Sequence, residues 1–375
     1  KFYNDQTFTP IIRVISITII ISGIKGIQQS YVSKNMLFKK FFFSTLGGTV
    51  FSAFLGIALA YCRFGVWAIV AQQLSNTIVD TIILWITVDW RPKKIFSWTR
   101  LSTLLSFGWK LLVSSLLETV YNNLRNLIIG KYYSSSDLAY YNQGDKLPNV
   151  FATNINVSID SVLLPTMSNE QDDRVKVKAM TRRSIKISTY IMAPIMIGLA
   201  FCAEPIVKLI LTDKWLPCVP FLRIFCVTYM FYPIHTANLN AIKAMGRSDM
   251  FLKLEILKKV FGLALLFCTM WYGVMVMAYS LLFASVINQI INSWPNRKLL
   301  EYTYIEQIID ILPSIVLSLI MGILVYFIGL INLPNIFVLL IQILAGIMLY
   351  IIGSVIFKLE EFKYIMNVVN GFIKK

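Results

Sequence analysis

The sequence predicts an all-α polytopic membrane protein with about eleven transmembrane helices, and three observations support this fold class. Hydrophobic residues make up 57% of the 375 residues and charged residues only 14%, whereas a soluble domain carries about 25% charged residues. Apolar runs of about 20 residues, the length that a helix needs to cross a bilayer, recur along the whole chain. These runs are continuous rather than alternating, which favours helices over a closed β-barrel.

The predicted spans are separated by short polar connections. Three spans come before a basic connection at residues 90–106, six lie within residues 107–300, and two lie within residues 301–357. In chain order, the spans are 10–32, 41–62, 65–88, 107–130, 138–166, 184–203, 217–242, 254–272, 273–294, 307–330 and 335–357. Residues 358–375 predict an amphipathic helix on the membrane surface, because apolar residues recur there at helical spacing. These apolar residues are Phe362, Ile365, Val369 and Ile373.

The distribution of Lys and Arg predicts which side of the membrane each connection faces. The formal net charge is +16, and the basic residues lie mostly in the short connections. Alternate connections carry 24 Lys and Arg on one side and 5 on the other. Because basic residues hold short loops in the cytoplasm, the richer side, which includes the C-terminus, is predicted to be cytoplasmic. We therefore expect a multi-pass protein of the cell inner membrane, with membrane lipids and no nucleic acid among its partners.

The start of the chain suggests that it is part of a longer protein. The first residue is Lys1, and no charged, then apolar, then small-residue pattern of a signal peptide follows it. An odd number of spans with a cytoplasmic C-terminus would also place Lys1 outside the cell. We expect instead that one or more further spans precede it.

A weak internal repeat predicts a transporter with two related bundles. The segments Pro10-Ile-Ile-Arg13 and Pro220-Phe-Leu-Arg223 open spans that lie six apart. Two spans further on, Phe64-Gly65-Val66 and Tyr272-Gly273-Val274 again precede spans that lie six apart. An even offset makes the two copies parallel, as in carriers whose halves enclose a cavity near the bilayer midplane.

Polar side chains inside the predicted spans form stripes along helix faces. Span 107–130 places Glu118, Asn122 and Arg125 at intervals of three and four residues, hence on one face. A second stripe runs along span 138–166. Such side chains either bond neighbouring helices together or face a hydrated cavity. For the lone amides the first interpretation is favoured, whereas the charged residues on two adjacent spans favour a cavity.

The chemistry of these side chains predicts two roles. Amides suit sugar hydroxyls, and cations at membrane depth suit phosphate oxygens. The predicted substrate-binding residues are Arg125, Lys146, Lys25, Asn122 and Asn149. The residues predicted to set the cavity charge or to couple transport to ions are Glu118, Asp145, Asp160 and Asp80.

No motif in the chain predicts an enzyme or a cofactor. The sequence contains no Walker lysine loop, no GxSxG elbow, no HExxH pair and no EF-hand loop. Its five cysteines show no CxxC spacing and are interpreted as packing residues. The single histidine, His235, is weak evidence for a metal or for proton coupling. We predict a transporter without catalytic residues, cofactors or metal ligands.

Longer segments carry a family resemblance over essentially the whole chain. They are Leu127-Ile-Ile-Gly-Lys-Tyr-Tyr-Ser-Ser-Ser-Asp-Leu-Ala-Tyr-Tyr-Asn142, Leu147-Pro-Asn149, Val162-Leu-Leu-Pro-Thr-Met-Ser168 and Asn238-Leu-Asn-Ala-Ile-Lys-Ala-Met-Gly-Arg-Ser-Asp249. With them the chain resembles the Wzx-type polysaccharide-transport branch of the multidrug, oligosaccharidyl-lipid and polysaccharide exporter superfamily.

The resemblance implies a 6+6+2 transporter, with two six-span bundles and two extra spans, of which this chain is the C-terminal part. Residues 1–89 would end the N-terminal bundle and 90–106 would form a cytoplasmic linker. Residues 107–300 would form the C-terminal bundle, 301–357 the two extra spans, and 358–375 a cytoplasmic amphipathic tail.

The resemblance also implies a function. The chain would be a flippase that moves undecaprenyl-pyrophosphate-linked oligosaccharide across the cytoplasmic membrane for O-antigen, capsule or exopolysaccharide synthesis. Polysaccharide-assembly proteins would be further partners. Three alternatives are a drug or metabolite exporter of the same superfamily, a membrane polysaccharide polymerase or ligase, and an inactive gene fragment. The short outer connections without histidine argue against the polymerase or ligase.

Overall fold

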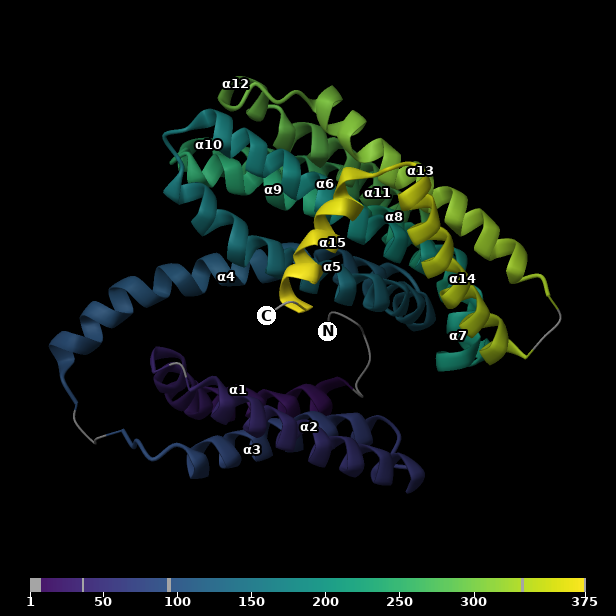
Figure 1. The fold of residues 1–375 in the computed structure, drawn as a ribbon. Coiled ribbons are helices and arrows are strands. Elements are labelled where there is room, and N and C mark those ends of the chain that lie inside the picture. Colours follow the sequence, from purple (N-terminus) through teal and green to yellow (C-terminus); the bar gives the residue numbers. More distant parts are fainter. Residues whose placement is uncertain (1–7, 36, 93–95, 332–333, 374–375) are drawn as a thin grey trace. The chain divides into compact units, whose positions relative to one another are not determined.

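The structure is a computed structural model that describes residues 8–35, 37–92, 96–331 and 334–373. Over these ranges every regular element is a helix, which confirms the predicted all-α class (Figure 1). The chain divides into two compact units, Lys1–Val120 and Tyr121–Lys375. Several residues of the charge count, Lys1, Lys93, Lys94, Lys374 and Lys375, lie outside the described residues.

The first unit contains α1 (Phe8–Lys34), α2 (Phe38–Tyr61), α3 (Val66–Thr87) and the first part of α4 (Trp98–Tyr132). Helix α3 packs against both α1 and α2. Gly48 allows α2 to approach α3 closely, since a Cβ at Gly48 would lie 2.9 Å from the Cβ of Asp80. At one end of the unit the Tyr31 ring stacks on Trp90, with 4.9 Å between centroids.

The second unit contains the rest of α4 and the remaining helices, several of which are short. They are α5 (Ser135–Asn169), α6 (Arg174–Phe201), α7 (Ala203–Leu211), η1 (Asp213–Cys218), α8 (Val219–Met230), α9 (Tyr232–Ala244), α10 (Ser248–Thr269), α11 (Val274–Ser293), α12 (Asn296–Leu299), α13 (Tyr304–Ile328), α14 (Asn335–Ile356) and α15 (Glu360–Ile373).

The predicted span 217–242 is two helices rather than one. Helix α8 ends at Met230, and α9 begins at Tyr232 with Pro233 as its second residue. Proline has no backbone N–H to continue the hydrogen bonding of the preceding helix, so it interrupts the span there. By length and composition, Asp213–Ala244 still counts as a single candidate span.

Eight segments of the described chain are long and apolar enough to cross a membrane, so the chain is a multi-pass membrane protein. Three of the predicted spans, 107–130, 138–166 and 254–272, are not among these eight. The structure makes these segments helical, within α4, α5 and α10. Each of these three helices carries charged residues that lower its hydropathy, among them Glu118 and Arg125 in α4, Asp145 and Asp160 in α5, and Lys258 and Lys259 in α10.

The core of the second unit lies around α6. Met192 and Met196 of this helix are fully buried, and α6 packs along α13. A Cβ at Gly322 of α13 would lie 2.7 Å from the Ile197 side chain, so this glycine permits the close helix contact. The same core includes Phe225 and Cys226 of α8.

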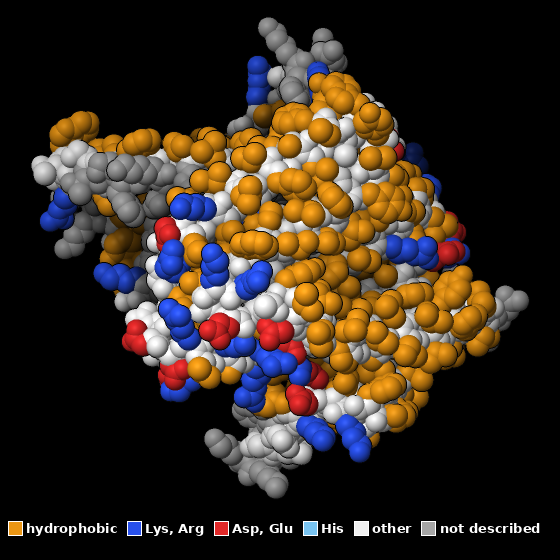
Figure 2. All heavy atoms as spheres, turned by 90° about the horizontal axis from the view of Figure 1, so that it is seen from above, with side chains coloured by type: hydrophobic (Ala, Val, Ile, Leu, Met, Phe, Trp, Pro, Cys, Tyr) orange, Lys and Arg blue, Asp and Glu red, His pale blue; other side chains and the backbone are white. Residues whose placement is uncertain are grey.

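Apolar side chains also cover much of the outside. Ile320 and Ile323 of α13 and Leu344 and Ile347 of α14 are exposed, as expected for helices that face lipid. Figure 2 shows hydrophobic side chains over a broad part of one face, with Lys, Arg, Asp and Glu gathered together in another part.

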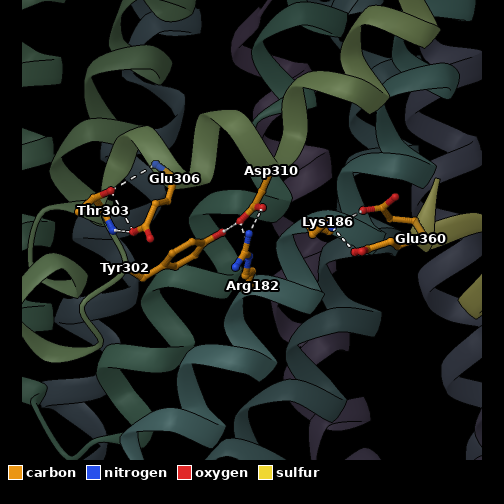
Figure 3. Close-up of polar contacts among 8 residues, drawn as sticks. Arg182, Lys186, Tyr302, Thr303, Glu306, Asp310 and Glu360 are labelled. Carbon is orange, nitrogen blue, oxygen red and sulfur yellow. Dashed lines mark hydrogen bonds and ion pairs between the residues drawn. The ribbon is translucent and has the colours of Figure 1, made fainter. Parts of the chain in front are cut away.

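An ion cluster joins α6 to the start of α13 (Figure 3). Arg182 donates two hydrogen bonds to Asp310, from Nε at 2.8 Å and from a terminal nitrogen at 2.7 Å. The Tyr302 hydroxyl donates to Asp310 at 2.8 Å. Burial raises the pKa of Tyr302 above its ordinary value, so the phenol stays protonated as a donor. Next to it, Thr303 and Glu306 cap the first turn of α13.

The last helix, α15, is attached to α6 by charge. Lys186 donates to Glu360 at 2.7 Å and lies 3.1 Å from Glu361 (Figure 3). The Arg183 guanidinium lies 3.6 Å above the Tyr364 ring. The predicted helix is present as α15, and its Phe362 and Ile365 pack against the main core. The side chains of Val369 and Ile373 lie outside the described residues.

Candidate functional site

The second unit holds a polar pocket with a cavity volume of about 560 Å³, within the ~300–1,000 Å³ of typical ligand sites. Two helices contribute most of its polar groups. Helix α4 provides Tyr121, Asn122, Arg125 and Asn126, and α5 provides Tyr141, Asn142, Asp145 and Asn149. On each helix these residues recur at helical spacing, which places them on one face. Helices α8 to α11 complete the wall.

Arg125 provides the positive charge of this pocket. Its guanidinium donates to the Met277 carbonyl oxygen and, at 3.1 Å, to the Ser280 hydroxyl, both on α11. Among the described residues, no carboxylate lies within ion-pair distance of it. The cation is therefore held in place by neutral acceptors, and its charge is not neutralised by a neighbouring carboxylate.

Asp145 provides a negative charge that is held separately. Its carboxylate accepts a hydrogen bond of 2.5 Å from the Tyr229 hydroxyl and one of 3.3 Å from the Asn149 amide. Asn149 in turn accepts from Thr153 at 2.8 Å. Both carboxylate oxygens are thus bonded to neutral donors, which fixes the orientation of the side chain.

Aromatic rings form one wall of the pocket. Tyr229 packs edge-on against Tyr232, with 4.7 Å between centroids. Tyr141 packs edge-on against Phe225, with 5.2 Å between centroids. These rings combine apolar faces with hydroxyl groups, so the pocket offers both stacking surface and hydrogen bonds to a polar ligand.

Two smaller cavities continue this pocket along α9. The first, of about 240 Å³, shares Thr228, Tyr232 and Asn288 with the main pocket and adds His235 and Lys258. The second, of about 230 Å³, shares Thr236 and Leu239 with the first. We call the three adjoining cavities the polar trail.

The second of these cavities ends the polar trail beside charged residues. Asp160 of α5 and Lys243 of α9 both line it. Asn240 also lines it, and is 1% exposed. Neither polar atom of its amide has a partner among the described residues. A buried amide of this kind is available to hydrogen-bond a ligand or water.

The polar trail includes five of the predicted site residues. Asn122, Arg125, Asp145 and Asn149 share the main pocket, and Asp160 lines its last cavity.

The other predicted site residues lie elsewhere. Lys146 is exposed on α5 and lines none of the three cavities. Lys25 and Asp80 bond to each other in the first unit at 2.5 Å. Glu118 is exposed on the part of α4 that belongs to the first unit.

Sequence reasoning missed the aromatic residues and two cations of the polar trail. Tyr121 and Tyr141 lie four residues before the predicted Arg125 and Asp145, so helical spacing contained a signal for them. Tyr229 belongs to α8 and Tyr232 to α9, and no spacing within α5 could indicate the hydrogen bond between Tyr229 and Asp145. Lys243 and Lys258 are among the 24 basic residues counted for the predicted cytoplasmic side, so the sequence contained no sign that they line a cavity.

Comparisons with known proteins agree on one family. Residues 1–220 match the family described as polysaccharide biosynthesis protein. The teichuronic acid biosynthesis protein TuaB of Bacillus subtilis (strain 168) is 22% identical over 333 residues, which are 87% of this chain and 68% of that protein. The lipopolysaccharide biosynthesis protein WzxC of Escherichia coli (strain K12) is 21% identical over 336 residues, 85% of this chain and 67% of that protein.

A solved structure has the same fold. The lipid II flippase MurJ, in an inward closed conformation, matches with a TM-score of 0.74 and 19% identity. The match covers 93% of this chain and 74% of the other.

Proposed function

The chain belongs to the polysaccharide biosynthesis protein family, and from that premise we propose that it is a flippase for a lipid-linked oligosaccharide. The Wzx-type resemblance is confirmed, since the family matches residues 1–220 and related transporters match most of the chain. The cargo we propose is undecaprenyl-pyrophosphate-linked oligosaccharide for a surface polysaccharide, crossing the cytoplasmic membrane.

We propose that α4, α5 and α10 also cross the membrane. With the eight candidate spans they would give the C-terminal part of a 6+6+2 transporter, with a cytoplasmic C-terminus. Two observations support this. The fold similarity extends over 93% of the chain, and the polar faces of α4 and α5 meet at a cavity instead of facing lipid.

The observation that carries the proposal is the uncompensated Arg125 in a pocket of amides and phenols. A guanidinium binds phosphate oxygens through two parallel hydrogen bonds, so Arg125 would hold the pyrophosphate. Asn122, Asn149 and the tyrosine hydroxyls would bond the sugar hydroxyls, while the lipid chain stays in the bilayer. Asp145 and Asp160 would set the charge along the polar trail.

The remaining predicted residues have different places in the proposed mechanism. Lys25 and Asp80 already neutralise each other, so binding of the cargo by Lys25 would require that this pair opens. The exposed Lys146 and Glu118 would act only if they face a cavity in another conformation of the transporter.

The test is Arg125→Gln in the full-length protein, measured by the amount of surface polysaccharide in a strain that lacks its own copy. We expect a loss of at least tenfold, since a charged hydrogen-bond partner contributes about 1.5–3 kcal/mol. Arg297→Gln removes the same charge from an exposed position on α12 and should leave the polysaccharide unchanged. Equal polysaccharide in both variants, at equal expression, would remove the basis of the proposal. If the protein instead exports a cationic drug or metabolite, drug resistance will change and the polysaccharide will not.

A further inference from the structure

A separate polar cavity lies at the far ends of α6 and α13 from the Arg182 cluster. Its volume is about 320 Å³, and it is lined by Glu204 and Lys208 of α7, Arg223 of α8 and Gln342 of α14. It shares no lining residue with the polar trail. The proposed flippase mechanism does not use it.

The charges of this cavity favour an anion. The Arg223 Nε donates to the Ala200 carbonyl oxygen at 3.2 Å, and within the described chain no carboxylate forms an ion pair with its guanidinium. Lys208 pairs with Glu204 at 2.8 Å, and both side chains are partly exposed. Two cations therefore face one carboxylate, and the arginine has hydrogen-bond donors left over for a phosphate group.

Gln342 adds an acceptor that has no partner. The residue is 2% exposed, and its Nε2 donates to the Val325 carbonyl oxygen at 3.0 Å. Its Oε1 is buried and has no hydrogen bond within the described part of the chain. A Cβ at Gly329 would lie 2.7 Å from the Gln342 Nε2, so the glycine leaves room for this amide. A hydroxyl group of a ligand would satisfy the free oxygen.

An apolar groove begins where the polar cavity ends. Gln342 lines both, and the groove continues between α6 and α14 with a volume of about 400 Å³. Two glycines, Gly198 and Gly346, keep it open, because a Cβ at either position would meet no atom closer than 3.4 Å. The groove and the cavity together are complementary to an amphiphile with an anionic, hydroxyl-bearing head.

We propose that this site holds one anionic phospholipid of the bilayer, with the chemistry of phosphatidylglycerol. The phosphate lies at Arg223 and Lys208, a headgroup hydroxyl donates to the Gln342 Oε1, and one acyl chain fills the groove. The two cations that face one carboxylate select this lipid over a zwitterionic one. The free Gln342 Oε1 selects it over a lipid whose headgroup has no hydrogen-bond donor, such as phosphatidylcholine. This lipid stays bound to the protein and is not the transported cargo.

Native mass spectrometry of the purified, delipidated chain in detergent tests the site by titration with phosphatidylglycerol. We expect Arg223→Gln to weaken binding about tenfold, and Arg297→Gln to leave it unchanged. Gly346→Leu fills the groove and should weaken binding as well. Its matched control is Gly23→Leu, because a Cβ at Gly23 would meet nothing within 4 Å. Thermal melting of each variant verifies that it is folded.

Several results would overturn the proposal. Equal binding by the Arg223 and Arg297 variants would show that the head does not lie at Arg223. Equal binding of phosphatidylcholine would remove the role of charge. Tighter binding of undecaprenyl phosphate would make this a carrier-lipid site, and displacement by inorganic phosphate alone would exclude the groove.

Discussion

The Arg182–Asp310 pair offers a prediction that depends on which partner is removed. The Asp310 side chain is 4% exposed, whereas the Arg182 side chain is 52% exposed. Arg182→Met therefore leaves a buried carboxylate with Tyr302 as its remaining side-chain donor, whereas Asp310→Leu leaves a guanidinium that water can still reach. Losing one partner of a buried pair costs about 3–5 kcal/mol. We expect the full cost for Arg182→Met and about 1–3 kcal/mol for Asp310→Leu, the penalty for an unpaired Tyr302 hydroxyl.

The double variant sharpens this prediction. Replacing a buried ion pair by apolar side chains is often neutral, so Arg182→Met with Asp310→Leu should be less destabilised than Arg182→Met alone. The free energy of unfolding would be measured by reversible denaturation in mixed micelles. Lys176→Met is the control, because water reaches both side chains of its pair with Glu170 and surface pairs contribute about 0–1 kcal/mol.

Two outcomes would contradict the reasoning. Equal losses from the two single variants would mean that burial does not set the cost. Additive losses in the double variant would mean that the two side chains do not interact.

Two further predictions concern the pocket and the tail. Tyr229→Phe removes the donor to Asp145, so we expect surface polysaccharide to fall several-fold at unchanged expression, measured against Tyr279→Phe on the exposed side of α11. The ion pair with Lys186 lowers the pKa of Glu360. Because the pKa of Glu360 is lowered, this contact stabilises the attachment of α15 in full when the pH is above the ordinary Glu pKa of about 4.3. The stabilisation is lost as the pH falls through the lowered pKa of Glu360. Limited proteolysis should release α15 more readily at that acidic pH, and Lys186→Gln should abolish the difference.

Residue spacing along the helices was enough to predict four of the eight polar residues that α4 and α5 contribute to the main pocket. Intervals of three and four residues fix which side chains share a helix face, and so Asn122 and Arg125, as well as Asp145 and Asn149, meet in one pocket. Spacing did not separate Lys146 from Asp145, since neighbours in sequence such as Arg125 and Asn126 share the pocket, whereas Lys146 is exposed and lines none of the three cavities.

Contacts between different helices could not be predicted from the sequence. The Met277 carbonyl that holds Arg125 and the Tyr229 hydroxyl that holds Asp145 come from α11 and α8. Their positions depend on the register in which these helices pack, and a stripe on α4 or α5 contains no information about that register. The Lys25–Asp80 pair depends in the same way on how α1 packs against α3.

The difference between the two ion arrangements favours the second unit as the anion-binding part of the proposed flippase. In the first unit Lys25 and Asp80 bond directly, so an anion that approaches Lys25 must compete with a carboxylate 2.5 Å away. In the second unit Arg125 and Asp145 line one pocket, but neutral groups hold each of them, Met277 and Ser280 for the arginine and Tyr229 and Asn149 for the aspartate. Such a cation is fixed before the ligand arrives and no ion pair has to be broken. In the proposed mechanism, a pyrophosphate group that enters the pocket would therefore gain the full interaction with Arg125. Asp145, which lines the same pocket, would repel it and limit how tightly it is held, as a flippase that must release its cargo requires.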